Sequence, residues 1–411
     1  MLIGSGVAIA IPGPSAGAAL PSGGLLPFGC ANPANRLADV LLPAAQATAG
    51  SAVTCFGTVR LGVGFLGAAA TPGPVGYGPG DLQRAYGLGG LKGRGRTVAI
   101  VDAFDDPKAE ADLAVYRAAY GLPPCTTANG CFRKVNQNGK AAPLPASDFG
   151  WAEEISLDLD AVSAVCRTCH ILLVEANGPN VGPLMAAVDT AVRLGAIAVS
   201  NSYGGREDQS ILRSDAHFNR RGVTMAAASG DAGYGVQWPA SSPFVTAVGG
   251  TSLHRAKNAR GWTEKAWAGA GSGCSKFEPK PAWQRDRGCA NRSVADVSAL
   301  ADPQSGLGVY DTFNNCLLAL LCDGMIAAGT AKGLNGWAQI GGTSLSTPIV
   351  AAIYALAGNH RKARYLYANR RDLHDVRTGS NGKCSVTYLC TARVGYDGPS
   401  GLGTPRGAGA F

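Results

Sequence analysis

Two continuous apolar runs constrain the fold of this chain most strongly: TVAIVDA at 97–103 and HILLVEA at 170–176. Uninterrupted apolar runs of this length are typical of strands buried on both faces. Residues 182–195 have helical spacing and precede another apolar run, AIAVSNSYG at 196–204, so strand, helix and strand alternate. This order implies a parallel sheet, which GVTMAAASGD and FVTAVGGTSL extend. The sequence therefore predicts an α/β fold with a parallel sheet flanked by helices.

Composition divides the chain into three parts. Residues 76–411 are predicted to form one large domain, because 411 residues are within reach of a single α/β domain with extensions. Residues 23–75 are rich in Ala, Gly and Pro and are expected to form a loosely structured extension. Residues 1–22 resemble a signal peptide but lack a Lys or Arg before the apolar core, so we expect an upstream start or atypical export.

Charge and hydropathy exclude two classes of protein. The net charge of +8 is spread thinly, and the densest basic run, HRKARYLYANRRD at 360–372, has the spacing of a solvated helix face. We therefore expect no nucleic-acid binding. No apolar run reaches the roughly 18 residues of a membrane-spanning helix, so we expect no integral membrane segment. We expect a monomer.

The cysteines predict an oxidising compartment. All 12 fall into close pairs in sequence order, which suggests disulfides that close small loops and hence a secreted, extracellular protein. Cys166, Cys169 and His170 also satisfy the CxxCH pattern of covalent haem attachment, but the following strand leaves little room for a macrocycle, so a disulfide is expected there. The expected pairs are Cys30 with Cys55, Cys125 with Cys131, Cys166 with Cys169, Cys274 with Cys289, Cys316 with Cys322, and Cys384 with Cys390.

The stretch QIGGTSLSTPIVAAIYALAG at 339–358 places a serine before an apolar helix. Gly341 and Gly342 permit a sharp bend, and Pro348 is expected in the first helical turn. Ser344 would then lie at a helix N-terminus, where backbone N–H groups favour developing negative charge and hence acyl transfer. The alternative is that Ser344 or Ser346 merely caps the helix.

A carboxylate is the expected base for this serine. A subtilisin-type serine needs a histidine followed by Gly and Thr, and no histidine of the chain stands in that context. A base needs only hydrogen-bond reach and a suitable pKa, so paired acids become the candidates. The five histidines are His170, His217, His254, His360 and His374.

Three acids stand out. In WAEEISLDLDAVSAVC, Glu154 and Asp158 are four residues apart beside a buried helical stripe, so they share a face. In a cleft their repulsion would raise at least one pKa; on a surface they would simply be solvated. Asp231, in AAASGDAGYG, follows a strand and lies between glycines, either at the site edge of the sheet or as a turn former.

Together these segments resemble the sedolisins, or serine-carboxyl peptidases, whose fold is subtilisin-like. The resemblance covers roughly residues 76–411 and includes EISLD, SNSYGGRE, SGDAG, WPASSPFVTAVGGTSL, WAGAGSGCS, ADVSALADP and GGTSLSTP. It implies that Ser344 is the nucleophile, Glu154 the general base and acid, and Asp158 the group that orients Glu154. A protonated Asp231 would donate to the oxyanion, which implies a secreted endopeptidase active in acid.

The resemblance also implies binding sites. Ser202, Tyr203 and Gly204 match the strand that pairs with the polypeptide substrate. HDVRTG and VGYDGPSGLGTP resemble the calcium site near the C-terminus, an all-oxygen set suited to Ca²⁺. Its ligands would be the carboxylates of Asp375 and Asp397 and the backbone carbonyls of Val376, Arg393 and Gly395.

Two further expectations follow from the resemblance. Without a histidine partner, Asp102 is expected to be structural. The residues before 76 are too few for the full prodomain of the family, which leaves self-activation in question. The competing interpretation is a catalytically silent member that acts as a secreted binding or surface protein, in which loss of a catalytic residue would be expected.

Overall fold

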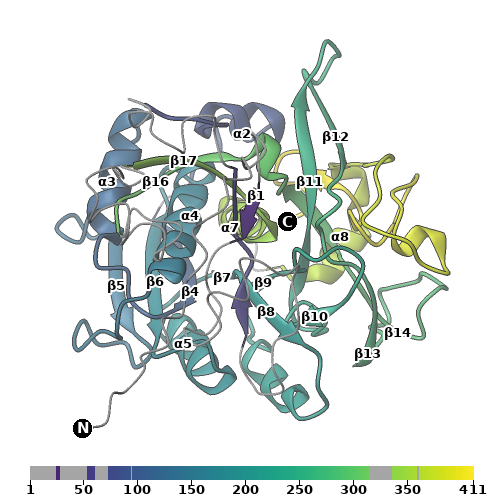
Figure 1. Ribbon diagram of the computed structural model, residues 1–411, viewed down its shortest axis with the longest axis horizontal. Helices are drawn as coiled ribbons and strands as arrows, with labels where there is room; N and C mark the ends of the chain where they lie inside the picture. The colour runs from purple at the N-terminus through teal and green to yellow at the C-terminus, as the bar shows by residue number, and fades with distance from the viewer. Residues whose placement is uncertain (1–24, 28–52, 61–72, 94, 314–335, 359–360) are drawn as a thin grey trace, which may run out of the picture.

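The protein is described by a computed structural model, which covers residues 25–27, 53–60, 73–93, 95–313, 336–358 and 361–411 (Figure 1). The expected leader at 1–22 and the expected pair Cys316–Cys322 lie outside these residues. No helix in the covered ranges is long and apolar enough to cross a membrane.

A mainly parallel sheet forms the centre of the molecule (Figure 1). Its strands run in the order β12-β11-β9-β7-β4-β6-β5, with β15 also paired to β11. Only the β11–β12 pair is antiparallel among these neighbours. The strands are β4 (Thr97–Ala103), β5 (Phe132–Asn136), β6 (His170–Ala176), β7 (Ala198–Asn201), β9 (Thr224–Ala228), β11 (Thr246–Arg255), β12 (Trp262–Ala266) and β15 (Val297–Leu300).

The helices cover the sheet because β4 and β9 are almost entirely buried and need apolar partners on both faces. Helices α4 (Phe149–Val165) and α7 (Thr343–Ala357) pack against each other, and both contact β4. Helix α5 (Val181–Arg193) packs on β4 and β6. The other α-helices of the described residues are α2 (Pro79–Ala85), α3 (Ala109–Ala119) and α8 (Ala363–Ala368).

Local chemistry sets the ends of the two central helices. The Asp148 carboxylate accepts hydrogen bonds from the N–H groups of Gly150 and Trp151, at 3.1 and 3.2 Å, and so caps α4. Helix α7 ends at Gly358, whose φ of 68° suits a residue without a Cβ. The start of α4 and the end of α7 are therefore set by residues next to them in the sequence.

Smaller sheets surround the centre. One has the order β1-β3-β17-β16 and another β10-β8-β2, while β13 pairs with β14 and β18 with β19. Their bounds are β1 (Leu25–Pro27), β2 (Thr54–Cys55), β3 (Thr58–Arg60), β8 (Tyr203–Arg206), β10 (Gln237–Trp238), β13 (Gly273–Pro279), β14 (Asn291–Val294), β16 (Leu307–Asp311), β17 (Gly336–Gly341), β18 (Leu373–His374) and β19 (Thr404–Pro405). Strands β1, β2 and β3 come from the expected extension, which thus pairs with the main body of the chain.

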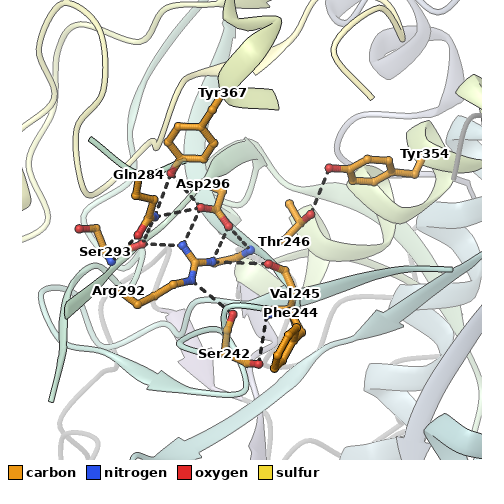
Figure 2. A network of polar contacts seen from close by, with 11 residues as sticks. Ser242, Phe244, Val245, Thr246, Gln284, Arg292, Ser293, Asp296, Tyr354 and Tyr367 are labelled. Carbon is orange, nitrogen blue, oxygen red and sulfur yellow. Dashed lines mark hydrogen bonds and ion pairs between the residues drawn. The ribbon is translucent and has the colours of Figure 1, made fainter. Parts of the chain in front are cut away.

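A buried ion pair ties the C-terminal part to the sheet (Figure 2). The Arg292 guanidinium donates to both carboxylate oxygens of Asp296, at 2.8 and 2.6 Å, and both side chains are fully buried. Tyr367 of α8 donates to the same carboxylate at 2.9 Å. A bidentate pair with further hydrogen bonds offsets the desolvation of two buried charges.

The predicted elements are confirmed, with one correction. The apolar runs form β4, β6, β7, β9 and β11, and the segment at 182–195 forms α5. Pro348 does not lie in the first turn of α7, because the helix begins at Thr343. Its missing N–H leaves the Ser344 carbonyl without the usual helical donor, and Ser202 Oγ contacts that carbonyl at 3.4 Å.

Disulfides confirm four of the expected pairs and exclude the haem pattern. The S–S bonds join Cys125 to Cys131, Cys166 to Cys169, Cys274 to Cys289, and Cys384 to Cys390. The thiols that would form thioether links to a haem at CxxCH are therefore already joined to each other. Cys55 is disulfide-bonded as well; its expected partner, Cys30, lies outside the described residues.

Candidate active site

Ser344 is presented by a tight turn between β17 and α7. Gly342 has a φ of 108°, and a Cβ on it would lie 1.9 Å from the carbonyl oxygen of Phe56. Only glycine fits this conformation and this close backbone approach. Ser344, the second residue of α7, is fully buried beneath the segment that contains Phe56.

The Ser344 hydroxyl has two backbone partners. Its Oγ accepts a hydrogen bond from Phe56 N at 3.0 Å and donates to Ser202 O at 3.1 Å. Among the described residues, no histidine forms a hydrogen bond with it, in line with the expectation of a different base. The hydroxyl is turned toward Ser202 and must rotate to donate to a carboxylate.

Glu154 and Asp158 lie on the part of α4 that packs against α7, and both are fully buried. Burial raises the Glu154 pKa well above its ordinary value, and the charges of Asp158 and Asp102 raise it further. The Ser344 hydroxyl is close enough to lower this pKa, although neither Glu154 oxygen accepts a hydrogen bond from a described residue. Glu154 is thus a buried carboxyl with open acceptor sites beside the serine.

Asp158 is held by Ser202, the residue between β7 and β8. Ser202 Oγ donates to its two carboxylate oxygens, at 2.9 and 2.8 Å. Burial raises the Asp158 pKa well above its ordinary value, the charge of Asp102 adds to the rise, and the Ser202 hydroxyl lowers it. Asp158 therefore has a fixed position one helical turn from Glu154.

Asp102 belongs to the same carboxyl cluster. It is fully buried at the end of β4, and neither of its oxygens has a hydrogen-bond partner among the described residues. Burial raises its pKa to about 8. Because its charge raises the pKa of both Glu154 and Asp158, Asp102 influences the site electrostatically, which the sequence alone did not indicate.

Asp231 lies beside Ser344, because its carboxylate is bound by Thr343, the residue before the serine. One oxygen, Oδ1, accepts hydrogen bonds from Thr343 N and Thr343 Oγ1, both at 2.8 Å. The other, Oδ2, has no hydrogen-bond partner among the described residues. Burial raises the Asp231 pKa to about 7, against the lowering effect of the two Thr343 donors. The free oxygen can therefore carry a proton in mild acid.

Ser202, the first of the three residues Ser202, Tyr203 and Gly204, lies beside Ser344. Ser202 contacts both Asp158 and Ser344, whereas the Tyr203 side chain points into the core and donates to Asn201 Oδ1 at 2.8 Å. Strand β8 pairs antiparallel with β2, with Gly204 opposite Thr54 and Tyr203 opposite Cys55. Tyr203 thus contributes its backbone, and not its side chain, to this edge.

Residues 53–60 are the part of the site that sequence reasoning missed. Phe56 contacts Ser344 through two backbone hydrogen bonds, yet it lies 288 positions away in the chain. The available signal was local: VTCFGTVR is rich in β-branched and aromatic residues, unlike the surrounding Ala- and Gly-rich sequence.

The expected calcium ligands lie close together in the C-terminal loops. Asp397 Oδ2 accepts from Arg393 N at 2.9 Å, and Asp375 Oδ1 accepts from Gly395 N at 3.0 Å. No described residue donates a hydrogen bond to the carbonyl oxygens of Val376, Arg393 or Gly395. Burial raises the Asp397 pKa to about 7, and the Asp375 charge adds to this. The described residues contain no group of three or more His, Cys, Asp or Glu side chains suited to a metal.

Comparisons with known proteins identify the family. A family model described as the subtilase family matches residues 150–376. Kumamolisin from Bacillus sp. (strain MN-32) is 30% identical over 369 residues, which cover 81% of this chain and 63% of that protein. Sedolisin from Pseudomonas sp. (strain 101) is 30% identical over 221 residues, which cover 45% of this chain and 33% of that protein. The chain thus spans less than two thirds of the length of either relative.

A solved structure supports the fold. Pseudomonas sedolisin, a serine-carboxyl proteinase complexed with two molecules of pseudo-iodotyrostatin, matches with a TM-score of 0.65 and 24% identity, over 81% of this chain and 96% of that one. The family model covers more than half of the chain and includes Glu154, Asp158, Asp231 and Ser344. The chain therefore belongs to the subtilase family, as a sedolisin-type member with a subtilisin-like fold.

Proposed function

We propose that the protein is a serine-carboxyl endopeptidase that hydrolyses polypeptides at acidic pH. The observation that carries the proposal is that Glu154 and Asp158 of α4 and Asp231 of the loop after β9 are brought together at Ser344, through the serine itself, Ser202 and Thr343 respectively. The named relatives support the same chemistry. A silent member of the family would be expected to lack one of these side chains, and none is missing.

In the proposed reaction, Ser344 Oγ attacks the carbonyl carbon of the substrate, and its proton passes to Glu154. The negative charge that develops on the substrate oxygen is stabilised by the Ser344 N–H and by the proton on Asp231 Oδ2. Glu154 then gives its proton to the leaving amine. A water molecule hydrolyses the acyl-enzyme by the same steps in reverse order.

The proposed acidic range follows from two opposed requirements. Glu154 must be ionised to accept a proton, and Asp158, held by Ser202, positions it. Asp231 must be protonated to donate, which holds below its pKa of about 7. Activity should therefore be lost as pH rises through neutrality and Asp231 ionises, and again toward lower pH once Glu154 and Asp158 are both protonated, a limit that their raised pKa values move upward from the ordinary carboxyl range.

We also propose a calcium ion at the C-terminal loops. Two carboxylates and three carbonyls without hydrogen-bond donors form an all-oxygen set, which suits a hard cation. Asp375, Asp397, Val376, Arg393 and Gly395 would hold the ion. Its positive charge would relieve the repulsion between the two acids and fix the loops, which is a structural role.

Secretion and the domain limits are also proposals. Four disulfides in the described residues favour an oxidising, extracellular location. A catalytic domain at 76–411, a monomeric state and a leader at 1–22 stay predictions.

Peptide hydrolysis tests the proposed activity. The folded protein is incubated with an unstructured polypeptide at about pH 4, and fragments are identified by mass, with Ser344→Ala as the matched inactive variant. Fragments from the wild type alone support the proposal. The wild type is tested both as the full chain and after any shortening that its own mass reveals. If the folded protein yields no fragments in either form, the proposed peptidase activity is ruled out.

A further inference from the structure

A hollow of about 1070 Å³ lies in the C-terminal part of the molecule, and none of its described lining residues belongs to the candidate active site. It is formed by the loop between β13 and β14, by α8 with the turn that follows it, and by the loop at 388–402. The described lining contains two aspartates, no lysine and six arginines: Arg285, Arg287, Arg364, Arg370, Arg371 and Arg393.

The arginines give the hollow an excess of positive charge. All six are exposed, and no described residue forms an ion pair with any of them. Of the two aspartates, Asp286 is already paired at 3.0 Å with Lys280, which lies outside the described lining. In that lining, Asp372 alone is left to offset the six guanidinium charges. Because like charges that are held together repel each other, an anionic ligand would relieve a repulsion that the fold itself leaves.

Four aromatic rings in a row also line the hollow. The ring centroids are 4.7 Å apart for Trp283 and Tyr367, 6.1 Å for Tyr367 and Tyr396, and 6.3 Å for Tyr396 and Tyr388. The Tyr367 hydroxyl donates to Asp296 (Figure 2), and the Tyr388 hydroxyl donates to a carboxylate at 2.7 Å, so both rings are held in place. Tyr, Trp and Arg are the residue types that contribute most to the binding of polypeptides at protein surfaces.

The carboxylates of a polypeptide fit this lining. The arginine guanidinium is a planar fork that binds a carboxylate through two parallel hydrogen bonds, whereas a lysine would bind it as a point charge. The aromatic rings can cover the backbone and the aliphatic parts of the same polypeptide. Arginines and fixed aromatic rings together therefore suit a segment that carries several Asp or Glu side chains.

The geometry of the rings disfavours single-stranded nucleic acid, which would need ring faces open to stacking bases. Neighbouring rings of the row are tilted by 51°, 35° and 61°. The Arg393 guanidinium carbon lies over the Tyr388 ring, 5.9 Å from its centroid. That of Arg292 lies over the Trp283 ring at 5.3 Å. The row therefore does not offer a series of parallel, open faces.

The wall of the hollow is joined to the loop that carries Asp231. Asn381 O accepts a hydrogen bond from Tyr234 N at 2.8 Å, and Asn381 N donates to Cys390 O at 3.0 Å. Asp231 comes shortly before Tyr234 in the sequence, and Tyr388 comes shortly before Cys390. One residue thus connects the two loops, so a long polypeptide bound at Ser344 could also reach the hollow.

We propose that the hollow is an accessory site that binds an acidic stretch of the polypeptide substrate. The inference rests on the proposed peptidase function and adds a substrate class to it: polypeptides with clustered Asp and Glu residues. A free Glu side chain has a pKa of about 4.3 and is only partly ionised at an acidic working pH. The guanidinium charges lower the pKa of a bound carboxyl, so binding should be full above about pH 5 and weaken as pH falls below about 4.

Binding is tested with Ser344→Ala, which cannot digest the ligand, and a short peptide made only of glutamates. Calorimetric titration at about pH 6, where glutamate is ionised, should show binding of this peptide and none of a glutamine peptide of the same length. Arg285→Gln combined with Arg370→Gln should weaken binding about three- to tenfold, as expected for two exposed charge pairs. Arg393 is left unchanged, because its carbonyl belongs to the proposed calcium site.

The matched control changes the same charge elsewhere. Arg213→Gln combined with Arg221→Gln removes two exposed arginines outside the described lining, and this variant should bind the glutamate peptide as the parent chain does. Equal weakening in the two double variants would overturn the inference, because the effect would then come from the net charge alone. Tighter binding of single-stranded DNA of the same charge than of the glutamate peptide would also overturn it.

Hydrolysis tests the accessory role. A cleavable peptide with a glutamate tail should have a lower KM with the wild type than the same peptide with a glutamine tail, at the same kcat. The variant Arg285→Gln with Arg370→Gln should lose this difference and keep the wild-type kcat and KM for the glutamine-tailed peptide. An unchanged difference in this variant would contradict the inference.

The outcomes distinguish this inference from the proposed function. If both peptides are hydrolysed with the same KM, the accessory site is wrong and the peptidase function stands. If Ser344→Ala binds the glutamate peptide at these arginines but the wild type cuts neither peptide, the proposed function fails, and the role of the hollow in substrate binding fails with it.

Discussion

Thr343 holds one oxygen of Asp231 with two hydrogen bonds, both at 2.8 Å, and the other oxygen has no hydrogen-bond partner among the described residues. This arrangement fixes which oxygen can carry a proton, because Thr343 N is a permanent donor and needs an acceptor. The other oxygen, Oδ2, is left as the site of protonation. Asp231 can therefore act as a hydrogen-bond donor only while it is neutral.

The first prediction concerns this donor. Asp231→Asn keeps an acceptor for Thr343 and places an amide N–H in the cleft at every pH, so peptide hydrolysis should extend to higher pH than in the wild type. Asp231→Ala should lower kcat by about 10²–10³-fold, as for other oxyanion donors. Rates measured from about pH 3 to pH 8 check both. If the hydrolysis rate of Asp231→Asn falls at the same pH as that of the wild type when the pH is raised, the oxyanion role is contradicted.

The second prediction concerns Asp102 and stability. Its pKa is raised from 3.8 to about 8 in the folded protein, so the group favours folding below about pH 4 and disfavours it progressively as pH rises to about 8. The slope of the unfolding free energy against pH reports how many more protons the folded chain binds than the unfolded chain. In Asp102→Asn, this number should fall by about one across this range.

Urea unfolding of Ser344→Ala chains, which avoids self-digestion, measures this dependence. The control is Asp208→Asn. Asp208 is exposed, and hydrogen bonds from Ser210 lower its pKa, so its loss should change the pH dependence only in stronger acid than the range of Asp102. The same pH dependence in Asp102→Asn and in the parent chain would show that Asp102 is not a buried, protonated acid.

The third prediction concerns calcium. An ion that binds only the folded chain stabilises it by about 2.7 kcal/mol at one hundred times its dissociation constant, so calcium should raise the melting temperature by a few degrees. Asp375→Asn combined with Asp397→Asn should abolish the rise, whereas Asp208→Asn should keep it. An equal rise in the double variant would place the ion elsewhere.

The sequence could predict the central sheet and the acid pair because their signals are local. Runs such as TVAIVDA need two buried faces, and an i, i+4 spacing puts Glu154 and Asp158 on one side of a helix whatever else the chain does. The disulfides Cys125–Cys131 and Cys166–Cys169 were predictable for the same reason, since both close short loops.

The contacts across the cleft could not be predicted, because they depend on tertiary packing. Nothing local to Phe56 indicates that it would meet Ser344. The effect of Asp102 on the acid pair arises only when β4 lies against α4. Pro348 was expected in the first turn because proline is favoured there, and the actual start of α7 was set by Gly342, which adopts a conformation that other residues avoid.

The most direct test of the account is the pH profile of kcat/KM for peptide hydrolysis by wild type and Glu154→Gln, with folding of both confirmed and Ser344→Ala as the inactive reference. We predict an acidic optimum for the wild type and a loss of about 10⁴-fold or more in Glu154→Gln, since an amide cannot accept the serine proton. Activity that peaks near neutral pH and survives Glu154→Gln would contradict the carboxylate mechanism.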